Sequence, residues 1–263
     1  MNYNISLKNL SQQETESLLP DNLILLGYRG SIAHNMYVHK SNPNSIDDKD
    51  IMGIYIAPID HYLGIKQIKE VKEKFIKEWD CVCYELRKII NLLIKGNPNV
   101  LSLLWVKEQH IIFNTKWGEL LRENRNLFTS KQVYHSFNGY AWGQFKRMTH
   151  QKYNGYMGAK RKALVDKYKF DTKNAAHLVR LLKMGIEFLK EGVLYVERED
   201  APYLLSIKNG EWPLEKVKAE AERLFKLCEE TYTQSKLPNT VNHDKINDLC
   251  KQILIDYHKE NLI

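Results

Sequence analysis

The sequence predicts an α+β protein in which a small mixed β-sheet comes first and a mainly helical part follows. Short apolar runs bounded by glycine, proline or polar residues, typical of buried strands, lie in the first third of the chain. Segments with helical periodicity fill the second half. No flexible linker and no repeat of fixed period separates the two parts, so we expect a soft boundary near residue 125, between a sheet domain (1–125) and a helical domain (126–263).

The composition of the 263-residue chain excludes several classes of protein. Apolar residues make up 43% and charged residues 27%, which is ordinary for a globular protein and excludes disorder as its main state. No apolar run approaches the roughly 20 residues of a membrane helix, so we expect no membrane partner. The N-terminal segment has no apolar signal-peptide core. The four cysteines include no C-x-x-C, so a reduced, cytoplasmic protein without structural zinc is expected.

The first expected elements follow from caps and breakers. Ser11 and Glu14 form a capping-box pattern and Pro20 ends the segment, which predicts a helix near 11–19. After it we expect a strand at 22–26, a loop at 30–50, strands at 51–57 and 74–82, and a helix from Tyr84 that is broken at Gly96-Asn97-Pro98.

The remaining elements are mostly helices. Helical periodicity marks the segments near 131–150, 172–191, 214–236 and 243–258. A short hairpin, Val193–Val196 with Leu204–Ile207, is expected to interrupt them. Cys81 and Cys83, on an expected strand, are predicted to point to opposite faces and not to pair.

Acidic residues and a glycine gather where the expected strands begin and end. Gly30-Ser31 follows the first strand, Asp48-Lys49-Asp50 leads into the second, and Asp80 lies on the third. Asp48 and Asp50 are expected to share one face, where carboxylates suit Mg²⁺, a cation that commonly binds one or two carboxylates plus substrate phosphates. A glycine there lets the backbone approach a phosphate, and a serine donates to it. Taken alone, each piece is also typical of ordinary turns and exposed strand acids.

In combination, these residues resemble the DNA-polymerase-β-like nucleotidyltransferase superfamily, whose hallmark is Gly-Ser, a later Asp-x-Asp and a further strand carboxylate. Four segments resemble most the polymerase-β-like family encoded with RNA ligases in RNA-repair pathways: GSIAHN, DDKDIMGIYIAP, DCVCYELRKIINLLIKGNPNVLSLLW and KNAAHLVRLLKMGIEFLKEG. The similarity runs from about Leu23 to Arg198, about two-thirds of the chain. Relatives often carry a second glycine where His34-Asn35 stands here, which predicts a differently shaped phosphate loop.

The resemblance implies a metal-dependent enzyme that moves a nucleoside monophosphate from a nucleoside triphosphate to an acceptor hydroxyl. Asp48, Asp50 and Asp80 would be its catalytic residues and would bind Mg²⁺ or Mn²⁺, and Asp80 would activate the hydroxyl. Gly30 and Ser31 would bind the nucleotide. Glu85 competes with Asp80 for the third carboxylate, although its place at a helix start also suits a capping role.

A polar stripe on the helix expected at 172–191 is a second candidate for contact with phosphates. Lys173, His177 and Arg180 follow one another at helical spacing, and the apolar face lies largely opposite. This pattern suits an ordinary solvated face as well as a triphosphate or acceptor-phosphate site. With the family resemblance, we assign the three residues to nucleotide binding.

The net charge of the chain is concentrated in one segment. Residues 144–170 hold eight bases and one acid, which equals the whole net charge of +7. Tyr153, Tyr156, Tyr168 and Phe170 alternate with the bases, a combination suited to single-stranded nucleic acid, although such residues are also common in plain surface and core. Lys160 and Arg161 are assigned either to the polymer or to the nucleotide.

The sequence thus predicts a nucleotidyltransferase whose favoured acceptor is RNA, with a role in RNA repair or end modification. Two alternatives stay open. One is nucleotidylation of a protein or small molecule by the same residues. The other is a catalytically silent RNA-binding partner in repair, which the retention of Ser31, Asp48 and Asp50 disfavours.

Overall fold

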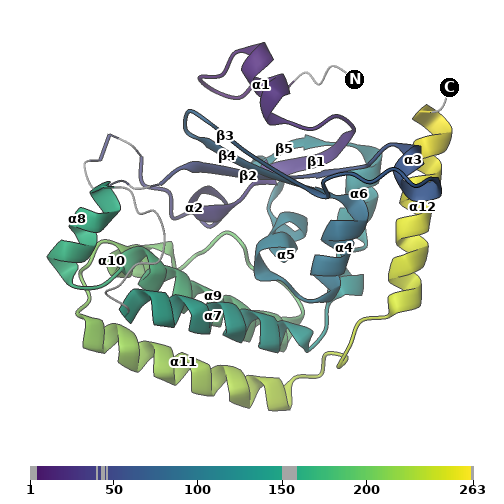
Figure 1. The fold of residues 1–263 in the computed structure, drawn as a ribbon. Coiled ribbons are helices and arrows are strands. Elements are labelled where there is room, and N and C mark those ends of the chain that lie inside the picture. The colour runs from purple at the N-terminus through teal and green to yellow at the C-terminus, as the bar shows by residue number, and fades with distance from the viewer. Residues whose placement is uncertain (1–4, 40, 43–44, 46, 150–158, 262–263) are drawn as a thin grey trace.

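A five-stranded mixed sheet forms the first part of the computed structural model, which describes residues 5–39, 41–42, 45, 47–149 and 159–261 (Figure 1). The strand order is β3-β4-β2-β1-β5, in which β2 and β4 are parallel and the other neighbours are antiparallel. The expected α+β class, a mixed sheet followed by helices, is confirmed. The strands are β1 (Leu23–Tyr28), β2 (Lys49–Tyr55), β3 (Val71–Ile76), β4 (Trp79–Glu85) and β5 (Ile111–Asn114).

Helices cover the two faces of the sheet unequally. The capped helix α1 (Gln12–Leu18) lies over one face, and α4 (Leu86–Ile94), α5 (Pro98–Trp105) and α6 (Lys116–Glu123) lie under the other (Figure 1). Alternate residues of β2 serve the two sides: Ile51 and Tyr55 belong to the apolar cluster under α1, and Met52 and Ile54 to the large core on the other side. Asp50 has the parity of Met52, so its side chain points to the side where the helical part lies.

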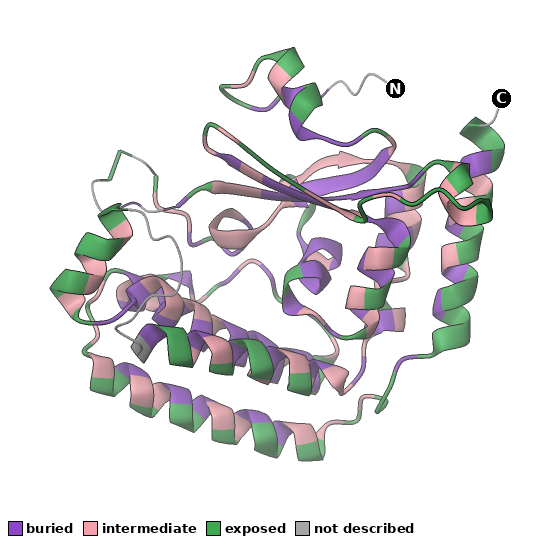
Figure 2. Ribbon diagram, viewed as in Figure 1, coloured by how far each residue is buried: buried purple, intermediate pink, exposed green. Residues whose placement is uncertain are grey.

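The helical part is built around α9 (Thr172–Glu191). This helix packs against α7 (Gln132–Thr149), α10 (Ala201–Lys208) and α11 (Leu214–Gln234), and α8 (Ala159–Tyr168) lies beside its N-terminal end. Figure 2 shows buried residues along the central strands and on the inward sides of these helices. The last helix, α12 (His243–Asn261), returns to the sheet part and packs on α4 and α6. The short elements are α2 (Gly30–Ala33), α3 (Ile59–Leu63) and two 3₁₀ turns, Glu108–His110 and Arg125–Phe128.

The structure corrects three expectations about local structure. Residues 204–207, predicted to form half of a hairpin, lie in helix α10, which has a proline in its first turn after Asp200. The single strand expected at 74–82 is the hairpin of β3 and β4, which turns at Lys77 with a positive φ of 55°. Cys81 and Cys83 point to the same side, because two residues are one full period of a strand, and their Sγ atoms lie 3.6 Å apart as free thiols.

Within the described ranges, no helix has both the length and the apolar character that a membrane span requires.

Candidate active site

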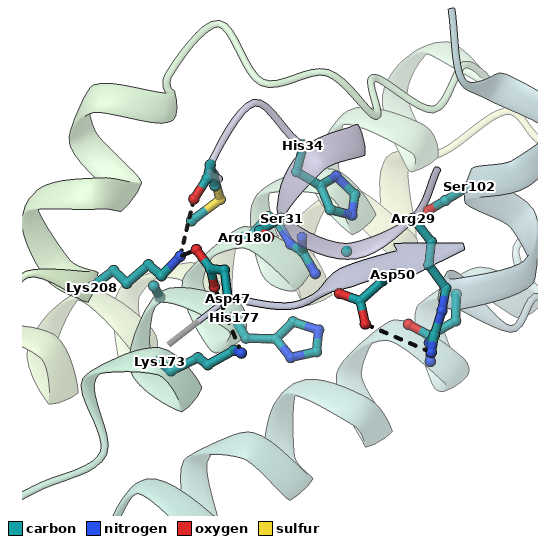
Figure 3. Close-up of a pocket in the computed structure, with 14 residues that line it drawn as sticks. Arg29, Ser31, His34, Asp47, Asp50, Ser102, Lys173, His177, Arg180 and Lys208 are labelled. Atoms are coloured by element: carbon teal, nitrogen blue, oxygen red, sulfur yellow. Dashed lines mark hydrogen bonds and ion pairs between the residues drawn. The ribbon is translucent and has the colours of Figure 1, made fainter. Parts of the chain in front are cut away.

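A cavity of about 300 Å³ opens between the sheet and the helical part, at the start of β2 (Figure 3). Its walls come from α2 and the residue before it, from the N-terminal end of β2, and from α5, α9 and α10. Four cations and two carboxylates line it, so the cavity is formally positive. We call it the first cavity; its lining residues are Arg29, Gly30, Ser31, His34, Met36, Asp47, Asp50, Asn99, Ser102, Lys173, Ala176, His177, Arg180 and Lys208.

The Gly30-Ser31 turn lies directly against the Asp50 carboxylate. Gly30 has a φ of +61°, a conformation that side chains rarely adopt. A Cβ there would collide with Asp50, 3.0 Å from its Cγ and still closer to Oδ2. The Arg29 N–H donates to the Asp50 carbonyl at 2.9 Å and fixes the turn on the strand. Only glycine therefore permits this approach of backbone and carboxylate.

Asp50 and Asp80 are direct neighbours across the parallel β2–β4 pair. The Arg29 guanidinium lies against both carboxylates, 3.2 Å from Asp80 Oδ2 and 3.9 Å from Asp50 Oδ1. Burial raises the pKa of Asp50 to about 6, against the lowering effect of Arg29 and Lys173, and the nearby charges of Asp80 and Asp48 add to the rise. The positive charge of Arg29 therefore does not fully offset the cost of burying the ionised Asp50 carboxylate.

The structure separates the two aspartates at 47 and 48. Asp48 is exposed and does not line the first cavity, although its charge reaches Asp50. Asp47, which the sequence reasoning passed over, is 2% exposed and accepts from the Val38 N–H at 3.0 Å. It also pairs with Lys208 and, at 3.7 Å, with Lys173. Asp47 thus connects the loop before β2 to helices α9 and α10.

Glu85 lies away from the first cavity. It is fully buried at the N-terminus of α4, where it accepts from the Lys88 N–H at 3.1 Å and from the Tyr62 hydroxyl at 2.6 Å. It pairs with Tyr55 in the ladder, five residues from the Asp50–Asp80 pair, or about 17 Å along the strand. Its contacts are those of a helix cap, and Asp80 is the carboxylate beside Asp50.

The predicted stripe on α9 faces the first cavity. Lys173, His177 and Arg180 all line it (Figure 3). Burial, with the charge of Arg198 adding to the effect, lowers the pKa of Arg180 to about 9, so this guanidinium stays charged but poorly compensated. Burial, followed by the charges of Arg180 and Lys173, holds the pKa of His177 well below its usual value, so the imidazole is neutral at pH 7.

Several buried polar atoms of the first cavity lack a hydrogen-bond partner among the described residues. They are Ser31 Oγ, His177 Nε2, Asp47 Oδ1, and the Nε atoms of Arg29 and Arg180. A buried polar group without a partner is costly, and groups of this kind around one cavity mark the place of a ligand. Arginine N–H groups and a hydroxyl donate to anions, so the ligand that fits is an oxyanion such as a phosphate.

The residues around Asp50 fit a hard divalent cation. Asp50 and Asp80 offer carboxylate oxygens at adjacent ladder positions, and the raised pKa of Asp50 shows an unmet need for positive charge. Among the residues whose placement is described, no three His, Cys, Asp or Glu side chains are already grouped as a metal site. This donor set therefore suits Mg²⁺ or Mn²⁺ completed by substrate phosphates rather than a closed protein cage.

His34 and Asn35 stand where relatives often carry a second glycine, and they shape the end of α2. His34 is 4% exposed, and its Nδ1–H donates to the Val196 carbonyl at 2.7 Å. Asn35 adopts a positive φ of 57°, a conformation that asparagine tolerates. Helix α2 thus ends in a left-handed residue without a glycine, and His34 ties it to the segment after α9.

The basic segment is described only in part. Arg161 donates to Asp171 Oδ2 at 2.7 and 3.0 Å and to Asn174 Oδ1 at 2.9 Å, so it connects α8 to the N-terminus of α9. Lys160 is exposed and lines neither the first cavity nor the neighbouring one described below. The part of the predicted nucleic-acid-binding segment at 150–158 lies outside the described residues.

Sequence reasoning missed three charged residues of the first cavity. Arg29 directly precedes the Gly30-Ser31 turn, and Asp47 directly precedes the Asp-x-Asp, so adjacency to a motif was the available signal. Lys208 carries no local signal, because only the fold brings α10 to the loop before β2.

Among three comparisons with known proteins, the family match agrees with the predicted polymerase-β-like resemblance. No curated protein matches the chain significantly. Among solved structures, the chain resembles a nucleotidyltransferase-like protein from Exiguobacterium sibiricum, with 13% identity and a TM-score of 0.28 over 84% of this chain and 72% of that one. The family model of the RNA repair pathway DNA polymerase β family, RlaP, matches residues 6–252, so the chain belongs to that family.

Proposed function

We propose that the protein transfers a nucleoside monophosphate from a nucleoside triphosphate to a hydroxyl group of RNA. One observation carries the proposal: the Gly30 turn lies very close to the Asp50 carboxylate. A phosphate bound at this turn would therefore also contact a divalent metal ion bound by Asp50. In such a reaction the bond between the α- and β-phosphates breaks, the acceptor oxygen bonds to the α-phosphorus, and pyrophosphate leaves.

The triphosphate would lie in the first cavity. Ser31 Oγ and the Arg180 guanidinium, both with unpartnered buried atoms, are placed to donate to its oxygens. The neutral His177 donates through Nε2 when its proton is on that nitrogen. Lys173 adds a further positive charge at the same wall.

The acceptor hydroxyl would be activated beside the carboxylates. Asp50, with Asp48 or Asp80, would hold Mg²⁺ or Mn²⁺, and the chemistry supplied by such an ion would be neutralisation of phosphate charge and a more acidic hydroxyl. Asp80 takes the hydroxyl proton, since its carboxylate lies beside that of Asp50 in the ladder. Arg29, which contacts both carboxylates, keeps them oriented.

RNA is the favoured acceptor for two reasons. The family to which the chain belongs is named for an RNA repair pathway. The segment 144–170 also holds eight bases and one acid, which equals the net charge of the chain, and such a basic segment attracts a polyanion.

The test is to incubate the protein with each α-labelled nucleoside triphosphate, Mg²⁺ or Mn²⁺ and a mixture of RNAs, beside an Asp50→Asn control. We expect label in RNA with the unchanged protein and none with the control. If the label appears in the protein or in a small molecule instead of RNA, that molecule is the acceptor and RNA is not. RNA binding without any metal-dependent labelling would identify a silent RNA-binding partner and end the proposal.

A further inference from the structure

A second cavity, of about 490 Å³, adjoins the first. The two share three lining residues, Asn99, Lys173 and His177, which therefore form a common wall. The other walls of the second cavity come from one face of α7, from Arg161 on α8 and from Asn174 on α9. The α7 residues that line it are Gly139, Tyr140, Gly143, Gln144 and Arg147.

The lining of the second cavity is suited to an anion. Of the residues that the structure describes, three cations line it, Arg147, Arg161 and Lys173, and no carboxylate does. Arg161 is already fixed by Asp171 and Asn174, so its guanidinium is held in place before any ligand arrives. Arg147 is exposed and makes no ion pair with a residue that the structure describes. Its guanidinium is therefore available to a phosphate.

The same cavity also offers groups that recognise a nucleobase. Gln144 is 6% exposed, and its Oε1 is buried without a hydrogen-bond partner among the described residues. An amide in this state suits the N–H groups on the edge of a base. Tyr140, whose hydroxyl accepts from Asn97 at 2.8 Å, provides an aromatic ring.

The second cavity has free space beside two glycines of α7. Added Cβ atoms at Gly139 and Gly143 would meet nothing within 4 Å, unlike one at Gly185 of α9, which would meet Phe137 at 3.2 Å. Open space over two glycines of one helix face leaves room for a flat ring and for a chain that continues outward. A cavity of this size lies within the usual range for small-molecule sites.

We infer that the second cavity binds the terminal nucleotide of a single-stranded RNA acceptor. Arg147 and Arg161 bind its phosphate, Gln144 and Tyr140 contact its base, and the sugar points across the shared wall toward Asp50. This inference rests on the proposed function, because it assigns the acceptor to one cavity and the triphosphate to the other. The triphosphate belongs in the first cavity, where the Gly30 turn and the carboxylates lie.

The test uses one variant that fills the second cavity and one that removes a positive charge from it. The affinities for RNA and for ATP are measured separately. Gly143→Leu places a side chain in the open space without a clash, and Arg147→Gln removes one cation. Binding of an internally labelled, ten-nucleotide single-stranded RNA is measured in EDTA without nucleotide, and ATP affinity is measured with Mg²⁺ and without RNA. We expect Gly143→Leu to weaken RNA binding about tenfold or more, the effect of one stacked base. Arg147→Gln should also lower the log–log salt slope by about 0.7.

Controls place the effect in the cavity. Lys226→Gln removes an exposed charge from α11 and should change neither affinity by more than about twofold. Loss of ATP affinity with unchanged RNA affinity would assign the cavity to the triphosphate and overturn the inference, as would no change in either. If no RNA is ever labelled but RNA binding still depends on Gly143 and Arg147, the proposed transfer fails and the RNA site stands. If the Gly143→Leu protein binds and labels RNA normally, the RNA site fails and the transfer stands.

Discussion

At the residue scale, the first cavity holds two carboxylates with opposite roles. Asp47 is buried beside Lys208 and stabilises the fold through that pair. Burial raises the pKa of Asp50, and the charge of Arg29 only partly offsets this rise. A carboxylate whose charge the folded protein opposes is typical of sites that bind a cation or a substrate.

Asp50→Asn is expected to stabilise the metal-free protein while it abolishes transfer. The pKa of Asp50 in the folded protein, about 6, exceeds its usual 3.8. The folded state therefore binds more protons in this window, and stability is lost as pH rises from about 4 through about 6. In EDTA at pH 7, the variant should gain about 2 to 3 kcal/mol in the free energy of unfolding, and the gain should fade toward pH 4. Urea unfolding at several pH values measures this.

The matched change at Asp47 should act in the opposite direction. Asp47→Asn leaves the Lys208 cation, 9% exposed, without its counter-charge and should cost about 3 kcal/mol at pH 7. Equal destabilisation by both variants would assign Asp50 a structural role instead.

Gly30→Ala should reduce transfer about a hundredfold, because the added methyl group displaces the turn from Asp50. Gly192→Ala is the control: it has a similar φ of +71°, at the C-terminus of α9, but no contact with the site. Both variants should lose about 1 to 2 kcal/mol in unfolding free energy from the left-handed backbone. Transfer rates and thermal unfolding are measured on both variants. Equal transfer rates for the two would show that Gly30 has no special role in transfer.

At the element scale, α9 supplies both the core and the site. Its apolar face lies in the large core, and the stripe of Lys173, His177 and Arg180 faces the first cavity. The N-cap of the helix is Asp171, which is 1% exposed, accepts from the Asn174 N–H at 3.1 Å and holds Arg161. The start of α9, and with it the stripe, is therefore connected to α8.

Arg161→Gln should destabilise the protein by about 2 kcal/mol, since it leaves the buried Asp171 carboxylate without its cation. Lys160→Gln, one position away and exposed, should change stability by less than about 0.5 kcal/mol. Denaturant unfolding and nucleotide affinity, measured on both variants, test the assignment of these residues to nucleotide binding. Loss of affinity in Arg161→Gln without loss of stability would show that Arg161 contacts the nucleotide and does not mainly hold α9.

At the scale of the whole molecule, the first cavity exists only where the two parts meet. The large core runs without interruption from Ile24 in β1 to Tyr257 in α12. Helix α12 leaves the helical part and packs on α4 and α6 under the sheet (Figure 1). The expected boundary near residue 125 stays a prediction, but α12, from beyond it, contributes to the sheet part.

Ile253→Ala in α12 should therefore lower the stability of the whole chain by about 2 to 4 kcal/mol, because the side chain is fully buried against the sheet part. Ile255→Ala, on the same helix but 50% exposed, is the matched control and should cost less than about 1 kcal/mol. Unfolding monitored by circular dichroism measures both. A similar small effect of the two variants would mean that α12 does not stabilise the sheet part.

The long helices and the main strands could be predicted because their signals are local. The capping box of α1, the apolar runs of β1 and β2 and the periodicity of α9 each lie within one segment. The hairpin of β3 and β4 was missed because its turn at Lys77 has no glycine, asparagine or proline. Residues 204–207 of helix α10 resemble a strand because a run of four residues, three of them apolar, is too short to distinguish the two periods.

The sequence by itself determined the α+β class, the family and the Gly-Ser and Asp-x-Asp motif, since these depend on residue order and short spacing. Only the tertiary structure decided that Asp47, rather than Asp48, enters the first cavity, that Asp80 rather than Glu85 lies beside Asp50, and that Arg29 pairs with both Asp50 and Asp80. Only it brought Lys208 from α10 to the loop before β2. Such contacts depend on strand register and on the packing of distant helices, which no local pattern encodes.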